Sequence, residues 1–126
     1  EKYYSNLIYG DKSLENEFKS KRELLYDNLV FHEMNPLPEI KTDLNYNEKV
    51  DNYFYNQLGA KIGNFIHGIF IDDYSVTSLK EYYGTGFEKY LMSYNNQSTI
   101  KKQCPILYSK IDKLIKVING EESKEQ

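Results

Sequence analysis

Several residue types whose abundance identifies a class of protein are scarce in this sequence. One cysteine, Cys104, stands among the 126 residues, so no disulfide can form within the chain. Tryptophan is absent, and there are three prolines and two histidines. No apolar run approaches the roughly 18 residues that a membrane-spanning helix needs. Lysine and arginine form no dense block and the formal net charge is −3, so neither a nucleic-acid partner nor an anionic membrane is expected.

Tyrosine, by contrast, is abundant. The chain has 13 tyrosines and six phenylalanines, which bring the aromatic share to 15%. The hydrophobic share of 40% and the charged share of 28% are ordinary for a soluble globular protein. The length fits one domain with a modest core. We therefore expect a single domain over 1–126, divided into a short helix-and-strand portion at 1–46, a helical portion at 47–119 and a polar tail at 120–126.

The first 46 residues predict one helix, one strand and one loop. Apolar residues recur near helical spacing behind Ser13, which can act as a cap, so a helix is expected over 13–28. The Leu-Val-Phe run at 29–31 suits a short strand. Two prolines exclude a regular helix from 34–46 and indicate a loop there. The predicted fold class is α+β, predominantly helical, with a small N-terminal β portion.

The strongest helical signal covers residues 47–69. Three glycines in this segment each weaken a helix by about 0.5–1 kcal/mol relative to alanine, and they indicate either close backbone contact or an early break. We expect one helix that ends before Asp72 and Asp73. Its apolar side chains recur at spacings of three and four and form a single stripe, made of Val50, Phe54, Leu58, Ile62, Phe65 and Ile69.

Two further helices are expected in the last third of the chain. Residues 78–81, Ser-Leu-Lys-Glu, have the form of a capping box, in which the hydroxyl and the carboxylate each accept a backbone N–H, so a helix begins at Ser78. Residues 95–98 indicate a turn. A final helix begins near Pro105 and ends with Gly120 as its C-cap, followed by a frayed tail at 121–126. The buried face of the helix from Ser78 is expected to hold Phe87, Tyr90, Leu91 and Tyr94.

Two stretches of the C-terminal third carry a family resemblance. Tyr74 precedes Glu81 by seven residues, residues 81–87 read EYYGTGF, and residues 101–109 read KKQCPILYS. These features resemble the anthrax lethal-factor-like zinc metallopeptidases, a family that includes the clostridial Pro-Pro endopeptidases. In that family a glutamate seven residues after a tyrosine opens an aromatic helix, and a Cys-Pro-x-x-Tyr-Ser step leads into the last helix. The resemblance implies a reduced zincin-like fold.

The zinc-binding motif of that family, H-E-x-x-H, is replaced in this chain. Its nearest match is Asn56-Gln57-Leu58-Gly59-Ala60, which keeps only the Leu-Gly pair of the family's H-E-[LF]-G-H. Two histidines four residues apart share a helical face and hold zinc, while the glutamate activates the metal-bound water. Asn56 is a poor zinc ligand, Ala60 is none, and Gln57 cannot take up a proton near neutral pH. Zinc proteolysis is therefore not expected.

The resemblance also implies roles for Tyr74, which would stabilise the oxyanion, and for Glu81, which would be the third zinc ligand. With no metal expected, these two positions and Asn56, Gln57 and Ala60 form a vestigial site, and no cofactor is expected. The N-terminal domains of anthrax lethal and edema factors look like degenerate copies of the same fold, and they bind a protein. The resemblance thus implies a non-catalytic protein-binding domain from a secreted bacterial toxin system, secreted or held at the bacterial surface. On this hypothesis Tyr74→Phe and Glu81→Gln leave binding nearly unchanged.

Other interpretations stay open. Glu81 also fits the role of an ordinary capping carboxylate. One alternative function is a metallopeptidase with replaced ligands, namely His67, Glu81 and either Asp72 or Asp73. Another is a structural domain of a larger surface protein, which would show no exposed apolar or aromatic patch. Cys104 is expected to be packed rather than nucleophilic.

Overall fold

The computed structural model describes residues 2–120, and this part of the chain is built from helices without a strand. The predominantly helical prediction is confirmed, and the small N-terminal β portion is wrong. The α-helices are α1 (Lys2–Tyr9), α2 (Ser13–Phe31), α3 (Glu39–Thr42), α4 (Glu48–Asn52), α5 (Ile62–Ile66), α6 (Leu79–Met92), α7 (Tyr94–Gln103) and α8 (Pro105–Ile118).

The expected strand at 29–31 is the last turn of α2. Leu25 and Leu29 are both buried, and their spacing of four continues the buried face of the helix beyond Asn28. Val30 and Phe31 point to solvent, so the run is not buried as a whole. A lone strand would leave its backbone groups without partners, whereas the helix bonds each of them internally. The helical spacing of the buried leucines therefore outweighs the β propensity of residues 29–31.

The predicted helix over 47–69 is interrupted at its centre. Asn47 caps α4 by accepting hydrogen bonds from the N–H groups of Lys49 and Val50 at 2.9 and 3.2 Å. A π-helical segment, η1 (Tyr53–Leu58), follows, and Gly59 then takes a φ of +54°, a conformation that favours glycine. A 3₁₀ turn, η2 (Gly59–Lys61), leads into α5. The early break that the glycines indicated is present, and its cause is Gly59.

Two other segments are more helical than expected. The predicted loop at 34–46 contains α3, which follows Pro38; proline is tolerated there because the first N–H groups of a helix lack intrahelical partners. The predicted turn at 95–98 lies inside α7. Ser93 is fully extended between α6 and α7, and its Oγ accepts the Asn96 N–H at 3.1 Å. Ile100 is the one buried residue among those of α7, so the sequence carried little periodic signal.

The helices α6 and α8 begin where the sequence predicted. The Oγ of Ser78 accepts the Glu81 N–H at 3.1 Å, which is the serine half of the predicted capping box. Gly120 takes a φ of +76° just after α8, as expected of a residue that ends a helix. Leu91 and Tyr94, which were expected to be buried, are exposed because the chain turns from α6 into α7 between them. The predicted tail at 121–126 lies outside the described residues.

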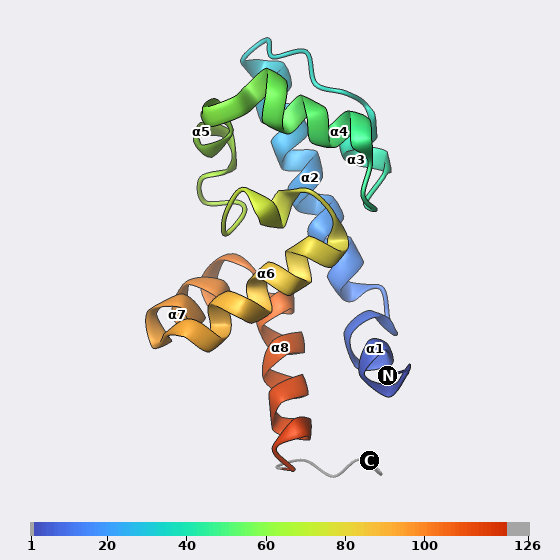
Figure 1. The fold of residues 1–126 in the computed structure, drawn as a ribbon, viewed down its shortest axis with the longest axis vertical. Coiled ribbons are helices and arrows are strands. Elements are labelled where there is room, and N and C mark those ends of the chain that lie inside the picture. The colour runs from blue at the N-terminus through green and yellow to red at the C-terminus, as the bar shows by residue number, and fades with distance from the viewer. Residues whose placement is uncertain (1, 121–126) are drawn as a thin grey trace.

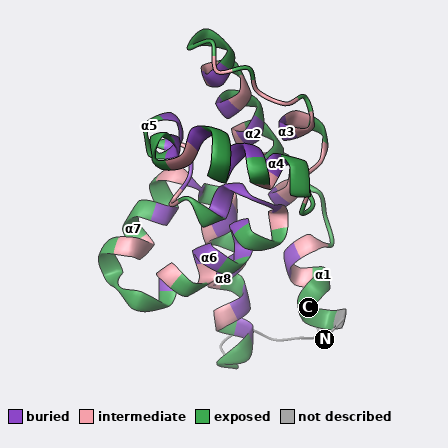
Figure 2. Ribbon diagram, turned by 45° about the horizontal axis from the view of Figure 1, so that its top comes forward, coloured by how far each residue is buried: buried purple, intermediate pink, exposed green. Residues whose placement is uncertain are grey.

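The helices are arranged around α2, which runs through the middle of the molecule (Figure 1). Helices α3, α4 and α5 surround its C-terminal half, while α6 begins beside its N-terminal half and leads to α7 and α8. The first helix, α1, lies beside α8 at the opposite end from α4. Buried positions form stripes on the inward faces of these helices (Figure 2). Apolar residues of α2, η1, α6 and α8 belong to one core cluster.

A fully buried arginine, Arg22 of α2, joins three segments of this core. Its guanidinium donates hydrogen bonds to the carbonyls of Ile40 at 2.7 Å, Val76 at 2.8 Å and Thr77 at 3.0 Å. Its charge also lies over the ring of Phe18, with 5.0 Å to the centroid. Burial lowers the pKa of Arg22 to about 10. Arg22 thereby fixes a short 3₁₀ turn, η3 (Tyr74–Val76), against α2 and sets the position of the start of α6.

Candidate functional site

The predicted remnant of the zinc motif does not lie on a regular helix. Asn56 and Gln57 are exposed near the end of the π-helical segment, and Ala60 is exposed in the 3₁₀ turn that follows. Positions 56 and 60 share one helical face only if the α-helix is continuous between them. The π-helical geometry and the positive φ of Gly59 break that continuity. Residues 56 and 60 therefore do not lie on one helical face, as the two histidines of H-E-x-x-H do.

Tyr74 and Glu81, in contrast, lie close to each other around one hollow. Tyr74 belongs to η3, which Asp72 caps: its Oδ1 accepts the N–H groups of Tyr74 and Ser75, each at 3.0 Å. Glu81 lies in the first turn of α6, held there by the bond of its N–H to Ser78. The structure thus brings together two of the five vestigial positions.

The alternative ligands His67, Asp72 and Glu81 are not assembled into a metal site. Within residues 2–120 no group of three or more histidine, cysteine, aspartate or glutamate side chains is placed to hold a metal ion. Asp72 already caps η3 through Oδ1, and its Oδ2 lies 3.5 Å from the Nζ of Lys89. His67 is exposed where α5 ends.

The hollow beside Tyr74 has a volume of about 370 Å³ and is lined largely by tyrosines and charged side chains. Its lining residues come from α4, η1, η3, the first turn of α6 and the chain just before α4 and α6. Tyr46, Tyr55 and Tyr74 are 66%, 48% and 62% exposed, so their rings are available at the surface. Its lining residues are Tyr46, Asp51, Tyr55, Tyr74, Thr77, Ser78, Lys80 and Glu81.

Acidic groups surround Tyr55 within this hollow. Its pKa is raised, first by partial burial and then by the charges of Asp51, Tyr74, Asp73 and Glu81. Three of these, Asp51, Asp73 and Glu81, are carboxylates that are charged near neutral pH. The three carboxylates form no ion pair with any side chain of residues 2–120.

Two neighbouring hollows share lining residues with this one. One, of about 440 Å³, shares Tyr46, Ser78 and Lys80 with the central hollow and reaches Tyr9. The other, of about 320 Å³, shares Tyr55 and reaches Ala60. We call the three adjoining hollows the tyrosine groove. It is defined by Tyr9, Tyr46, Tyr55 and Tyr74, with Asp51, Asp73, Lys80 and Glu81 as its charged residues.

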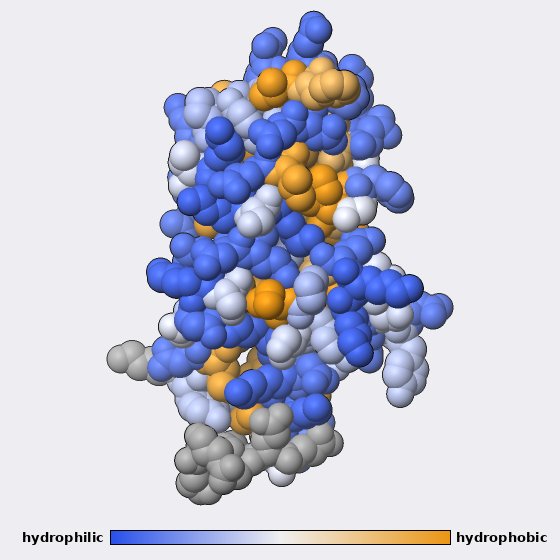
Figure 3. Space-filling view, turned by 180° about the vertical axis from the view of Figure 1, so that it is seen from behind, coloured by the Kyte–Doolittle hydropathy of each residue, from blue (hydrophilic) through white to orange (hydrophobic). Residues whose placement is uncertain are grey.

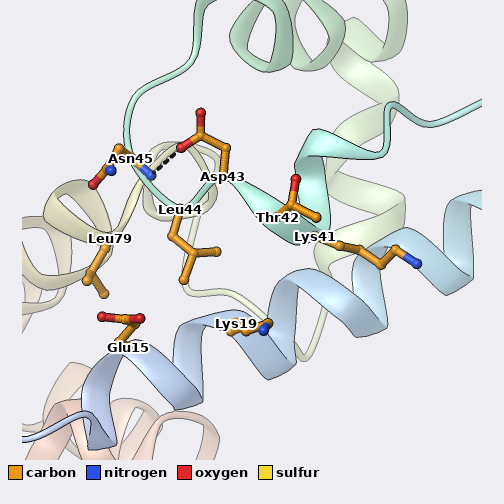
Figure 4. A pocket seen from close by; sticks show the side chains of 8 residues that line it. All are labelled: Glu15, Lys19, Lys41, Thr42, Asp43, Leu44, Asn45 and Leu79. Atoms are coloured by element: carbon orange, nitrogen blue, oxygen red, sulfur yellow. Dashed lines mark hydrogen bonds between the residues drawn. The ribbon is translucent and has the colours of Figure 1, made fainter.

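A further hollow of about 250 Å³ lies between α2 and residues 41–45 (Figure 4), and it shares Asn45 and Leu79 with the hollow that reaches Tyr9. Two of its charged side chains already contact nearby residues. The Nζ of Lys41 lies 4.3 Å from the centre of the Tyr26 ring. The Oδ1 of Asp43 accepts the Asn45 N–H at 3.1 Å. Lys41 points along α2 and away from Leu44, so the polar groups do not converge on one point. This hollow does not have the features of a ligand site.

Cys104 is packed, as predicted. It is fully buried at the start of α8, and burial raises the pKa of its thiol. Because the thiolate is the nucleophilic form, this environment opposes reactivity.

The sequence did not predict the residues that join Tyr74 and Glu81 in the tyrosine groove. Tyr55 could have been singled out, since it lies off the apolar stripe that contains Phe54 and Leu58 and so faces away from the core. Tyr46 gave no such signal, because it precedes α4 in irregular chain. Comparison with protein-family models, with curated proteins and with solved structures finds no match, so the resemblance to lethal-factor-like peptidases stays a prediction.

Proposed function

We propose that this chain is a non-catalytic protein-binding domain that binds its partner in the tyrosine groove. The main support for the proposal is that Tyr46, Tyr55 and Tyr74 are exposed and, among the described residues, make no stabilising contact through their rings or hydroxyls. Within residues 2–120, none of the three rings packs against another aromatic ring or a cation, and none of the three hydroxyls donates a hydrogen bond.

Three of the buried tyrosines, Tyr53, Tyr82 and Tyr90, behave differently, although the buried hydroxyl of Tyr83 has no hydrogen-bond partner within residues 2–120. Tyr53 donates to the Met34 carbonyl at 2.6 Å, and Tyr90 donates to the Asp112 carboxylate at 3.0 Å. Their hydroxyls serve the fold, as expected of buried polar groups. Exposed tyrosines gathered around one groove have no such role in the fold. Tyrosine is enriched at protein interfaces because its ring buries a large area and its hydroxyl hydrogen-bonds at low entropic cost.

The exposed apolar surface also favours binding over a purely structural role. A structural domain was expected to lack an exposed aromatic patch, whereas the groove gathers three exposed tyrosines. On the rear face, apolar side chains form separate patches on a surface that is otherwise mostly hydrophilic (Figure 3). No helix within residues 2–120 meets the length and hydrophobicity required to cross a membrane. The tyrosine groove is therefore the surface that we propose binds the partner.

The proposal includes descent from a lethal-factor-like peptidase and a reduced zincin-like fold. It is supported by the spacing of Tyr74 and Glu81 and by the KKQCPILYS segment at 101–109. Ala60, Tyr74 and Glu81, three of the vestigial positions, line the groove, so a former substrate cleft would now hold a partner. On this descent the domain belongs to a secreted bacterial toxin system and acts outside the cell or at its surface. This part of the proposal is an analogy of fold.

The test is affinity capture of secreted proteins from the source organism by the tagged chain and by two variants. Tyr46→Ala combined with Tyr74→Ala removes two rings of the groove, and Tyr94→Ala removes a ring that is 87% exposed but lies outside it. We expect one protein to be captured by the parent chain and by Tyr94→Ala, and lost with the double variant. Capture that is the same with all three proteins contradicts the proposal.

Catalysis is tested on the same preparation. Elemental analysis after purification without chelators measures bound zinc, and a proline-rich peptide library reports cleavage. We expect neither. Stoichiometric zinc together with cleavage that Glu81→Ala abolishes would replace the binding proposal with the metallopeptidase that uses Glu81 as a ligand.

A further inference from the structure

We infer that the tyrosine groove binds an arginine side chain presented by an extended segment of the partner protein. The inference rests on the proposed function and adds the chemistry of the partner. It follows from three features of the groove: the charges left without a counterion, the aromatic faces left without a cation, and the size and shape of the hollows.

The carboxylates of the groove lack a cation, unlike several others in the molecule. Within residues 2–120, Asp11, Glu39 and Asp72 each lie within 3.5 Å of a lysine Nζ. Asp51, Asp73 and Glu81 have no such neighbour. Lys80 lines the groove but makes no ion pair with them, and it leaves an excess of negative charge. Complementary charge on the partner is therefore positive.

The aromatic faces of the groove also lack a cation that other rings of the chain have. Lys41 lies over Tyr26 at 4.3 Å, and Lys101 lies over Tyr108 at 5.5 Å. In the core, the guanidinium of Arg22 lies over Phe18 at 5.0 Å and over Phe54 at 5.7 Å. In the described part of the chain, residues 2–120, no cation lies over the rings of Tyr46, Tyr55 and Tyr74. A cation from outside the chain would complete the same arrangement.

Arginine matches these two features better than lysine. Its guanidinium is planar, stacks on aromatic faces and offers paired donors to a carboxylate. A lysine ammonium is a compact and strongly hydrated point charge that gains less from a flat ring. An apolar side chain would bury Asp51 and Glu81 without a partner, which is costly. The polyanionic backbone of a nucleic acid would be repelled by them.

The dimensions of the groove favour a side chain carried by an extended segment. The central hollow of about 370 Å³ lies within the range of about 300–1,000 Å³ that is usual for ligand pockets. Its three tyrosines are exposed to solvent, and it adjoins the hollows that reach Tyr9 and Ala60. A peptide can therefore run along the groove with one arginine in the centre and its neighbours in the flanking hollows.

The experiment uses fluorescein-labelled peptides that carry one central residue in a glycine–serine background: arginine, lysine or citrulline. Citrulline keeps the shape of arginine and removes its charge. Fluorescence anisotropy measures affinity, and amide chemical-shift changes locate the site. We expect the arginine peptide to bind about fivefold or more tightly than the citrulline peptide, which corresponds to one close charge interaction of about 1 kcal/mol. The lysine peptide should fall between them.

Variants then assign the binding to the groove. Glu81→Gln and Tyr74→Ala should each weaken binding of the arginine peptide about fivefold, a loss of about 1 kcal/mol for one ion pair or one cation–π contact. This expectation replaces the one that follows from the resemblance alone, under which Glu81→Gln leaves binding nearly unchanged. Tyr94→Ala should leave binding unchanged, and about 1 M salt should weaken it. Circular dichroism verifies that each variant is folded. Equal binding of the arginine and citrulline peptides, no binding of either, or shift changes outside the groove overturns the inference.

The two proposals fail separately. If the groove variants abolish capture of a protein partner but the arginine peptide does not bind, protein binding stands and the arginine inference is wrong. If capture does not depend on the groove, the proposed function is wrong.

Discussion

Tyr82 of α6 donates a 2.7 Å hydrogen bond to the carboxylate of Glu17 on α2. The same carboxylate accepts the N–H groups of Ile106 at 2.7 Å and Leu107 at 3.1 Å, in the first turn of α8. Those N–H groups have no partner within the helix, and a negative charge is favourable at a helix N-terminus. Glu17 therefore caps α8 from another helix and joins α2, α6 and α8 at one point.

The first prediction concerns this junction. In Glu17→Gln, the neutral amide keeps one acceptor but turns an NH₂ group toward donors, so we expect a loss of about 1–3 kcal/mol in the free energy of unfolding. The matched control is Glu15→Gln, because Glu15 lies on the same helix and makes only an exposed 3.6 Å pair with Lys12. That change should cost about 0–1 kcal/mol. Urea unfolding followed by circular dichroism measures both, and equal losses would mean that Glu17 is not a structural cap.

Gly86 and Gly84 provide a second pair of matched positions in α6. A Cβ on Gly86 would lie 2.6 Å from Leu107 Cδ2, because α6 and α8 meet there, whereas nothing lies within 4 Å of a Cβ on Gly84. Overpacking costs about 1–3 kcal/mol, which exceeds the gain of about 1 kcal/mol in helix propensity. Gly86→Ala should therefore destabilise the protein, and Gly84→Ala should stabilise it by about 0.5–1 kcal/mol. Thermal unfolding measures the two shifts in Tm, and shifts of the same sign would contradict the close approach of α6 and α8.

The third prediction is a loss of stability at alkaline pH. Burial raises the pKa of Tyr82 and Tyr83, and burial followed by the hydrogen bond to Asp112 raises that of Tyr90 to about 12. In the unfolded chain these phenols titrate near pH 10. The folded state then holds more protons, so the stability that they contribute is complete below about pH 10 and falls as pH rises from there to about 12. Arg22 has the opposite effect, because its pKa is lowered to about 10 in the folded state. Its contribution to the free energy of unfolding therefore rises with pH above about 10, but it is one group against three tyrosines.

Tyrosinate absorbance and helical circular dichroism, recorded against pH, test this prediction. The buried tyrosines should ionise together with the loss of helix rather than before it. Tyr90→Phe should reduce the alkaline decrease in unfolding free energy, whereas Tyr94→Phe serves as the control because that ring is 87% exposed. Full ionisation of all tyrosines in a protein that keeps its helical signal would show that the hydroxyls are not protected.

The sequence predicted the elements whose signals are local, and it missed those that depend on distant contacts. Ser78 and Pro105 mark the starts of α6 and α8 through chemistry contained in a few residues. Glu17 caps α8 by accepting the N–H of Ile106, 89 residues later in the chain, and no local pattern can indicate such a contact. Arg22 was not predicted to be buried, because only the fold brings the Ile40, Val76 and Thr77 carbonyls around it.

In the candidate site, too, the sequence indicated residues with a local signal and missed those placed by distant contacts. Tyr74 and Glu81 were identified through their spacing, and the structure places both around one hollow. Tyr46 and Asp51 join them only because the segment that precedes η1 folds back onto the start of α6, where the Leu79 N–H bonds to the Leu44 carbonyl at 2.8 Å. A continuous helix over 47–69 would have placed Asn56 and Ala60 on one face, but Gly59 interrupts that helix.

The last prediction separates the residues of the groove from those of the fold. Tyr74 is 62% exposed, and its hydroxyl has no hydrogen-bond partner in the described residues, so Tyr74→Ala should change the free energy of unfolding by about 0.5 kcal/mol or less. Tyr53→Ala, by contrast, removes a buried ring and the 2.6 Å bond to Met34, and should cost about 3–5 kcal/mol. Urea unfolding compares the two. A cost above about 2 kcal/mol for Tyr74→Ala would identify Tyr74 as a packing residue and remove the central ring from the proposed binding surface.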